Sequence, residues 1–118
     1  MALPTDVSIA SLSLQTEPAR MLAWTLQNYG AYLVDNSGWS SANICVEYGP
    51  AGSFLDQFDS DWGFSLDTHG LDGSFAEDIV TLMAALAVVN NNAPTSIGGG
   101  GTPLQPPAPP LPRGAGAE

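Results

Sequence analysis

The stretch TEPARMLAWTLQNYG, residues 16–30, decides the fold, because it predicts a helix together with both of its ends. Thr16 is a suitable N-cap, and Pro18 lies in the first turn, where a missing N–H group costs no intrahelical hydrogen bond. Gly30 suits the left-handed residue that follows a helix. We therefore expect a helix from about residue 17 to residue 29. Its buried face would consist of the residues at helical spacing, namely Met21, Leu22, Thr25, Leu26 and Tyr29.

A second helix is predicted from about residue 75 to residue 88. Residues 74–77, SFAE, have the pattern of a capping box, with Ser74 as the N-cap and Glu77 three residues later. Three asparagines at 90–92 end the pattern. The inward face of this helix would carry Ile79, Leu82, Met83 and Leu86.

The segment between these helices has an extended pattern. Residues 31–34 (AYLV) and 43–48 (NICVEY) are rich in β-branched and aromatic residues, and turn-forming sequences follow both, which predicts two strands. Phe54, Leu55 and Phe58 favour a short amphipathic turn of helix. This order of elements predicts an α+β fold, with two main helices packed on a small, mostly antiparallel sheet.

The composition changes near Pro94 and divides the chain into a compact domain, 1–93, and a Gly/Pro-rich tail, 94–118. Proline cannot join a strand ladder and glycine loses the most entropy on ordering, so we expect a flexible hinge followed by polyproline II. A disordered tail or linker is one interpretation. Docking of Leu104 and Leu111 on the domain is the other.

The charge balance narrows the possible partners. Twelve acidic residues face two basic ones, Arg20 and Arg113, for a net charge of −10. Such a surface repels phosphate backbones, so no nucleic-acid or anionic-membrane partner is expected. No apolar run reaches the roughly 20 residues that cross a bilayer, and residues 1–10 lack the pattern of a signal peptide. We expect no membrane insertion, and either a cytosolic protein or a chain that begins inside a longer precursor.

One cysteine and one histidine offer little for metal chemistry. Cys45 lies in the apolar run 44–46, which favours a buried and inert thiol. His69 lies far from it in the sequence, and transition-metal sites usually recruit several such ligands. We expect no zinc or copper and no other cofactor, with calcium as the one alternative.

The densest group of acidic residues suggests three interpretations. These acids are Asp56, Asp59, Asp61, Asp67 and Asp72. Asp56, Asp59 and Asp61 could begin an irregular calcium loop, although the spacing does not fit an EF-hand. Asp56, Asp59, Asp61 or Asp67 could instead supply an acid and base for cleaving a glycosidic bond. The third interpretation is a solvated acidic loop above an aromatic cluster.

The segment 35–39, DNSGW, is the most site-like part of the sequence. It combines the carboxylate of Asp35, the amide of Asn36 and the indole of Trp39, and Trp62 could add a second platform. Neutral sugars are recognised by hydrogen bonds to their hydroxyls and by a flat apolar surface. We therefore predict these four residues as ligand-binding, and Asp35 as a further catalytic candidate. The alternative is an Asx-turn with a tryptophan folded onto the core.

Five short segments carry a pattern that resembles known sequences. They are residues 4–7 (PTDV), 14–20 (LQTEPAR), 26–35 (LQNYGAYLVD), 87–92 (AVVNNN) and 98–103 (GGGGTP). Together they resemble the C-terminal part of a group of large secreted bacterial proteins that also have an upstream β-rich, Gly-rich portion. The resemblance implies a secreted or cell-surface location and an upstream half as a partner. It implies no reaction and no catalytic residue.

Three functional hypotheses follow. The leading one is a non-enzymatic module of an extracellular bacterial protein that contributes to folding, surface display or recognition of a neutral polysaccharide. The second is a carbohydrate-active hydrolase or lyase with paired carboxylates. The third is a self-assembling homo-oligomer in which the tail reaches a neighbouring copy.

Overall fold

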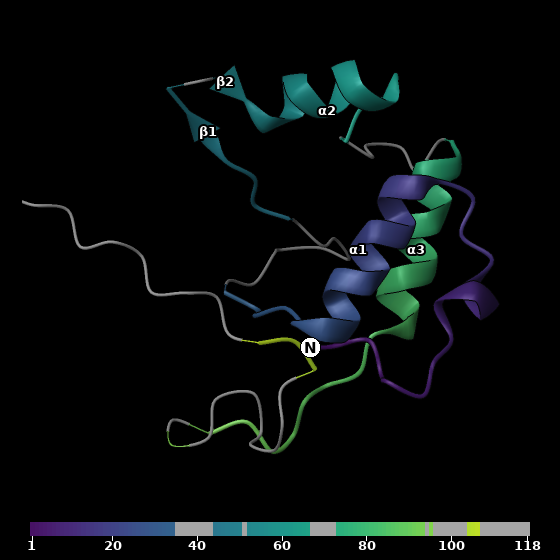
Figure 1. The fold of residues 1–118 in the computed structure, drawn as a ribbon, viewed down its shortest axis with the longest axis vertical. Helices are drawn as coiled ribbons and strands as arrows, with labels where there is room; N and C mark the ends of the chain where they lie inside the picture. The colour runs from purple at the N-terminus through teal and green to yellow at the C-terminus, as the bar shows by residue number, and fades with distance from the viewer. Residues whose placement is uncertain (35–43, 51, 67–72, 94, 96–103, 107–118) are drawn as a thin grey trace, which may run out of the picture.

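The computed structural model describes residues 1–34, 44–50, 52–66, 73–93, 95 and 104–106. Within these residues the elements follow the order η1 (Ile9–Leu12), α1 (Glu17–Asn28), β1 (Tyr48–Gly49), β2 (Gly52–Ser53), α2 (Phe54–Trp62) and α3 (Ser74–Ala85) (Figure 1). The two strands pair antiparallel, with Tyr48 opposite Ser53 and Gly49 opposite Gly52. The chain therefore has the predicted α+β fold.

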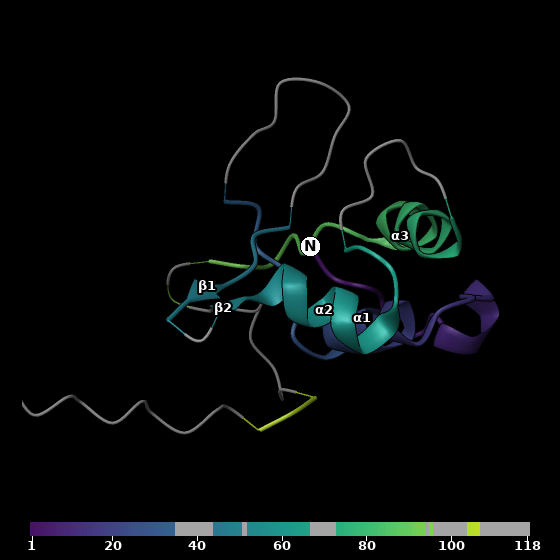
Figure 2. The ribbon, with the colours of Figure 1, turned by 90° about the horizontal axis from the view of Figure 1, so that it is seen from above.

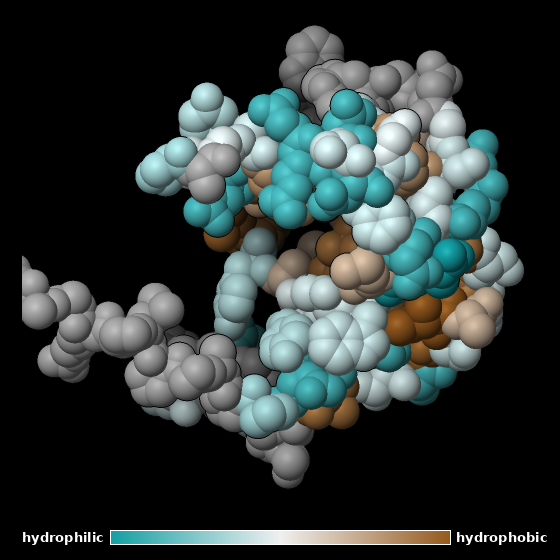
Figure 3. Space-filling model, turned by 45° about the horizontal axis from the view of Figure 1, so that its top comes forward, coloured by the Kyte–Doolittle hydropathy of each residue, from teal (hydrophilic) through white to brown (hydrophobic). Residues whose placement is uncertain are grey.

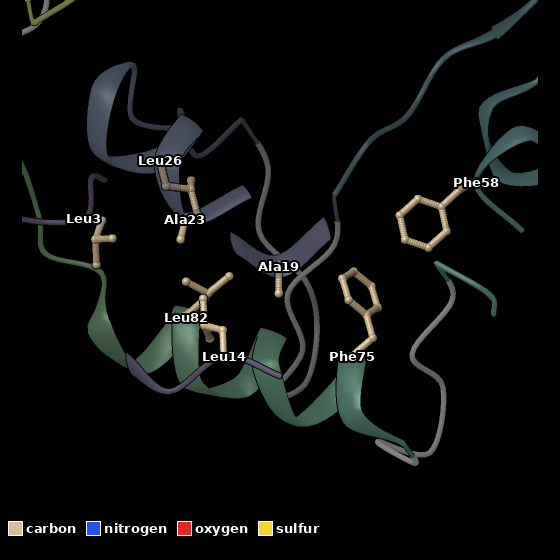
Figure 4. Packing of buried hydrophobic residues seen from close by; sticks show 8 residues of the cluster. All are labelled: Leu3, Leu14, Ala19, Ala23, Leu26, Phe58, Phe75 and Leu82. Atoms are coloured by element: carbon tan, nitrogen blue, oxygen red, sulfur yellow. The ribbon is translucent and has the colours of Figure 1, made fainter. Parts of the chain in front are cut away.

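The two long helices lie side by side and run in the same direction (Figure 1). Small residues of α1, Ala19 and Ala23, are fully buried and let α3 approach closely. Leu26 of α1 and Leu82 of α3 fill the space between the helices (Figure 4). This interface forms most of the hydrophobic core, to which Leu3 and Leu14 also contribute from the N-terminal segment.

The N-terminal segment closes the end of the core where both helices finish. Ala2 exchanges two backbone hydrogen bonds of 2.9 Å with Ala87, just after α3. Met1 exchanges two of 2.7 Å with Ala31, just after α1. The Gln27 side chain also donates to the carbonyls of Pro4 and Val7. The first residues of the chain thus hold the exits of α1 and α3 together.

The hairpin and α2 form a separate arm joined to the core by aromatic side chains. Figures 1 and 2 show the hairpin projecting away from the α1–α3 pair. Phe58 of α2 is buried, and its ring centroid lies 5.4 Å from that of Phe75 in α3 and 5.6 Å from that of Phe64. Figure 4 shows Phe58 and Phe75 facing each other. These rings attach α2 to the beginning of α3.

The predicted strand positions were wrong. Residues 31–34 and 44–47 adopt no strand, and the hairpin begins only at Tyr48. The side chains of Tyr32, Leu33 and Val34 are 68, 81 and 82% exposed. A strand needs a neighbour for its backbone groups, and the only backbone pairing described for 31–34 is that of Ala31 with Met1. β-propensity alone did not provide a partner.

The predicted helices exist, and their predicted inward faces are partly right: Leu26 and Leu82 are buried in the core, and Leu22, Ile79 and Leu86 pack against it. Other buried positions and one cap differ from the expectation. In α1, Met21 and Tyr29 are 56 and 61% exposed, whereas the buried residues are Pro18, Ala19, Ala23 and Leu26. In α3, Ser74 is not the N-cap but the first helical residue, and the N-cap position is occupied by Gly73. The buried residues of α3 are Phe75, Ala76, Asp78 and Leu82.

Candidate functional site

A buried carboxylate, Asp78 of α3, organises the beginning of α1. It is 3% exposed and accepts hydrogen bonds from the backbone N–H groups of Gln15 and Thr16, both at 2.8 Å, and from the Thr16 hydroxyl at 2.6 Å. A negative charge is favourable at the positive end of a helix dipole. All these contacts lie within the fold, so Asp78 is a structural residue rather than a site for a ligand.

Thr16 is the N-cap of α1 as predicted, but this contact explains why neither predicted cap makes its side-chain hydrogen bond. The Thr16 hydroxyl donates to Asp78 instead of capping α1 with its own oxygen. Glu77 accepts a 2.7 Å hydrogen bond from the Gln15 amide instead of closing a capping box. Sequence reasoning missed Asp78 because its partners lie 62 and 63 residues away. The sole local signal was an acid on the otherwise apolar side of the second helix.

The three acids proposed to start a calcium loop lie on a helix. Asp56, Asp59 and Asp61 all belong to α2 and are exposed to solvent. Asp56 and Asp59, three residues apart, share a side of α2, but Asp61 lies on another side, whereas a calcium loop must fold all its ligands around one point. Among the described residues no group of three acids, histidines or cysteines lies close enough to hold a metal ion.

One side of α2 combines an apolar surface with a carboxylate. Leu55, Asp59 and Trp62 follow one another at spacings of four and three residues, and we call them the α2 flank. Leu55 is 43% and Trp62 is 37% exposed. The Trp62 ring lies 6.4 Å from that of the buried Phe58, which restricts its position. The predicted ligand-binding residue Trp62 therefore presents a partly fixed, partly accessible indole.

A second aromatic feature was not predicted. Trp24 and Tyr29 at the end of α1 are 46 and 61% exposed, and their rings meet edge to face with centroids 5.9 Å apart. We call them the α1 aromatic pair. The prediction had placed Tyr29 in the core.

Other predicted residues have different outcomes. Asp35, Asn36, Trp39, Asp67, His69 and Asp72 lie outside the described residues. Cys45 was expected to be buried but is exposed, because residues 44–47 do not join a sheet.

Hydrophobic side chains reach the surface in several separate places (Figure 3). In the described parts of the chain, no helix has the length and apolar character needed to cross a membrane.

Comparisons with protein-family models, curated proteins and solved structures found no match to this chain.

Proposed function

We propose that this chain is a non-catalytic module of an extracellular bacterial protein and that it binds a neutral polysaccharide through the α2 flank. The observation that carries the proposal is the partly exposed Trp62, 37% accessible, one helical turn after the carboxylate of Asp59. The resemblance to secreted bacterial proteins is the basis for the extracellular location. The chain would present its ligand to an upstream half of the same protein.

The α2 flank has the chemistry that sugar recognition requires. The face of a pyranose ring is lined with C–H groups and packs on a flat aromatic surface, here Trp62. Sugar hydroxyls donate to carboxylate oxygens, which Asp59 supplies one helical turn earlier. Leu55 extends the apolar surface by a further turn. Because the neighbouring Phe58 ring already restricts the Trp62 side chain, Trp62 loses little conformational freedom when a ligand binds.

The net charge favours an uncharged polymer. With twelve acidic and two basic residues, the chain repels polyanions such as nucleic acids or sulfated and uronic-acid polysaccharides. Neutral glucans, mannans, xylans and galactans carry no such penalty.

A glycan array followed by isothermal titration calorimetry tests the proposal. We expect the full chain to bind at least one neutral polysaccharide, and Trp62→Ala to weaken that binding about tenfold, equivalent to about 1.4 kcal/mol. Asp59→Ala should weaken it less, because one hydrogen bond between solvated groups contributes less than the stacking surface.

The matched control is Trp24→Ala, which removes a somewhat more exposed tryptophan, 46% against 37% for Trp62, from a different helix. This variant should bind like the unaltered chain. Absence of binding to every neutral glycan, or equal loss in both variants, would contradict the proposal. Release of reducing ends from a bound glycan would instead support the hydrolase hypothesis.

A further inference from the structure

We propose that the Pro-rich segment 104–112 binds as a polyproline II helix on the α1 aromatic pair of its own chain. The segment reads LQPPAPPLP and contains no charged residue. The inference is independent of the proposed polysaccharide binding, because it concerns another helix and another tryptophan.

The first observation is a contact between the tail and α1. The side-chain amide of Gln105 donates to Asn28 Oδ1 at 3.2 Å, across 77 residues of sequence. Asn28 in turn donates through Nδ2 to the carbonyl of Trp24 at 2.7 Å. The beginning of the Pro-rich segment is therefore one side chain away from the backbone of Trp24, a member of the α1 aromatic pair.

The second observation is the arrangement of the two rings. Trp24 and Tyr29 lie at an interplanar angle of 68°, so they form a notch rather than one flat surface. Aromatic side chains of this kind recognise polyproline II segments by packing against proline rings, while donors such as the indole N–H bind the exposed peptide carbonyls. A notch fits a proline ring better than it fits the broad face of a sugar.

The reach of the Pro-rich segment and the positive charge that follows it both agree with binding to the α1 aromatic pair. A polyproline II helix advances about 3.1 Å per residue, so the four residues from Gln105 to Pro109 span about 12 Å. Asn28 and Trp24 are four residues apart, about 6 Å along the axis of α1. Prolines 106, 107 and 109 can therefore reach both rings. Arg113, one of only two basic residues, follows the segment directly and is attracted by the acidic domain.

Trypsin provides a simple test, because the chain contains two cleavable residues, Arg20 and Arg113. Arg20 lies in α1, pairs with Glu17 at 2.8 Å and donates to the Leu14 carbonyl, so it is protected in the folded chain. Cleavage after Arg113 requires the residues before it to enter the protease in extended form. Its rate follows the fraction of tail that is undocked.

In the full chain, we expect Trp24→Ala to raise the rate of cleavage after Arg113 about tenfold, measured by intact mass. Trp62→Ala is the matched control and should leave the rate unchanged. Gln105→Ala lies in the tail, does not touch the core, and should raise the rate by a smaller factor. Equal rates in all four proteins would overturn the proposal.

Two-dimensional NMR adds an independent measurement. Nuclear Overhauser contacts are expected between the Trp24 indole and proline δ protons, and they should disappear when prolines 106, 107, 109 and 110 are replaced by serine. An unchanged indole signal in that variant would overturn docking. Protection that increases with protein concentration would overturn binding within one chain and would indicate exchange of tails between two copies.

Discussion

Gly30 shows how one missing side chain keeps the ends of the core together. Its φ is +71°, and a Cβ at this position would lie 2.9 Å from the carbonyl oxygen of Met1. That oxygen accepts the 2.7 Å hydrogen bond from Ala31, so it cannot move away without breaking the N-terminal closure. The position therefore demands glycine for two reasons, backbone conformation and space.

We expect Gly30→Ala to lower the free energy of unfolding by about 2–4 kcal/mol, as measured by urea denaturation. The matched control is Gly63→Ala, at φ +72° but with open space around the added Cβ. It should cost only the strain of the left-handed backbone, about 1–2 kcal/mol. Equal losses in the two variants would show that the contact with Met1 does not contribute.

The buried carboxylate of Asp78 makes a second prediction at the scale of single residues. Asp78→Ala removes the acceptor for three hydrogen bonds and leaves backbone N–H groups of a partly buried segment unsatisfied. We expect a loss of about 2–4 kcal/mol in the free energy of unfolding. Asp59→Ala, an exposed acid on α2, should change it by less than about 0.5 kcal/mol.

A double-mutant cycle with Thr16→Val tests whether the contact is direct. Thr16→Val alone removes the hydroxyl that donates to Asp78, and it should cost about 1 kcal/mol. In the Asp78→Ala background the same change should cost almost nothing, because its acceptor is already gone. Additive losses would contradict the pairing of these two side chains.

At the scale of elements, the beginnings of two helices distinguish a true cap from an apparent one. The Ser53 oxygen accepts a 3.1 Å hydrogen bond from the N–H of Leu55 at the start of α2. Ser74, which the sequence pattern marks as a cap, lies inside α3. We expect Ser53→Ala to cost about 0.5–2 kcal/mol in thermal unfolding and Ser74→Ala to be close to neutral. The reverse ranking would support the capping-box prediction.

These elements also show which parts of the fold could be read from sequence. Both long helices were predicted to within about three residues, and for α1 the signals Pro18 and Gly30 act locally. The end of α3 was placed too late, because the helix stops at Ala85, before the asparagines at 90–92. The hairpin was displaced because pairing depends on a partner strand, which the propensity of residues 31–34 does not specify. The buried face of α1 was predicted only in part, since Leu26 is buried but the pattern favoured large side chains over Ala19 and Ala23, against which α3 packs.

For the candidate site, too, local features could be predicted from the sequence, whereas contacts between distant residues could not. Trp62 was predicted as a platform for ligand binding, and it is partly exposed on α2. The calcium loop failed because Asp56, Asp59 and Asp61 follow the helical period set by Phe54 and Phe58 rather than a loop. The hydrogen bond between Gln105 and Asn28 joins residues 77 positions apart, which no local pattern reports.

For the whole molecule, charge opposes the packing of a small core. The ratio of twelve acids to two bases leaves most carboxylates without a cationic partner, since at most two can pair with Arg20 and Arg113 individually. In the described residues the one ion pair is Arg20 with Glu17, and it is exposed. Repulsion among surface charges at low salt should therefore destabilise the compact state relative to the expanded chain.

Screening this repulsion should stabilise the protein. The Debye length falls from about 30 Å at 0.01 M salt to about 8 Å at 0.15 M, so the repulsion between most pairs of surface charges is largely screened at the higher concentration. If about 1 kcal/mol is recovered, the melting temperature should rise by about 4–8 °C between these sodium chloride concentrations, as followed by circular dichroism.

Replacing Asp59 and Asp61 by asparagine should raise the melting temperature at low salt, because both lie toward the negative end of the α2 dipole. The gain should shrink at 0.15 M salt, since the same charges are then screened in the parent. A melting temperature that stays flat or falls with salt would mean that specific contacts, rather than net charge, limit the stability of this fold.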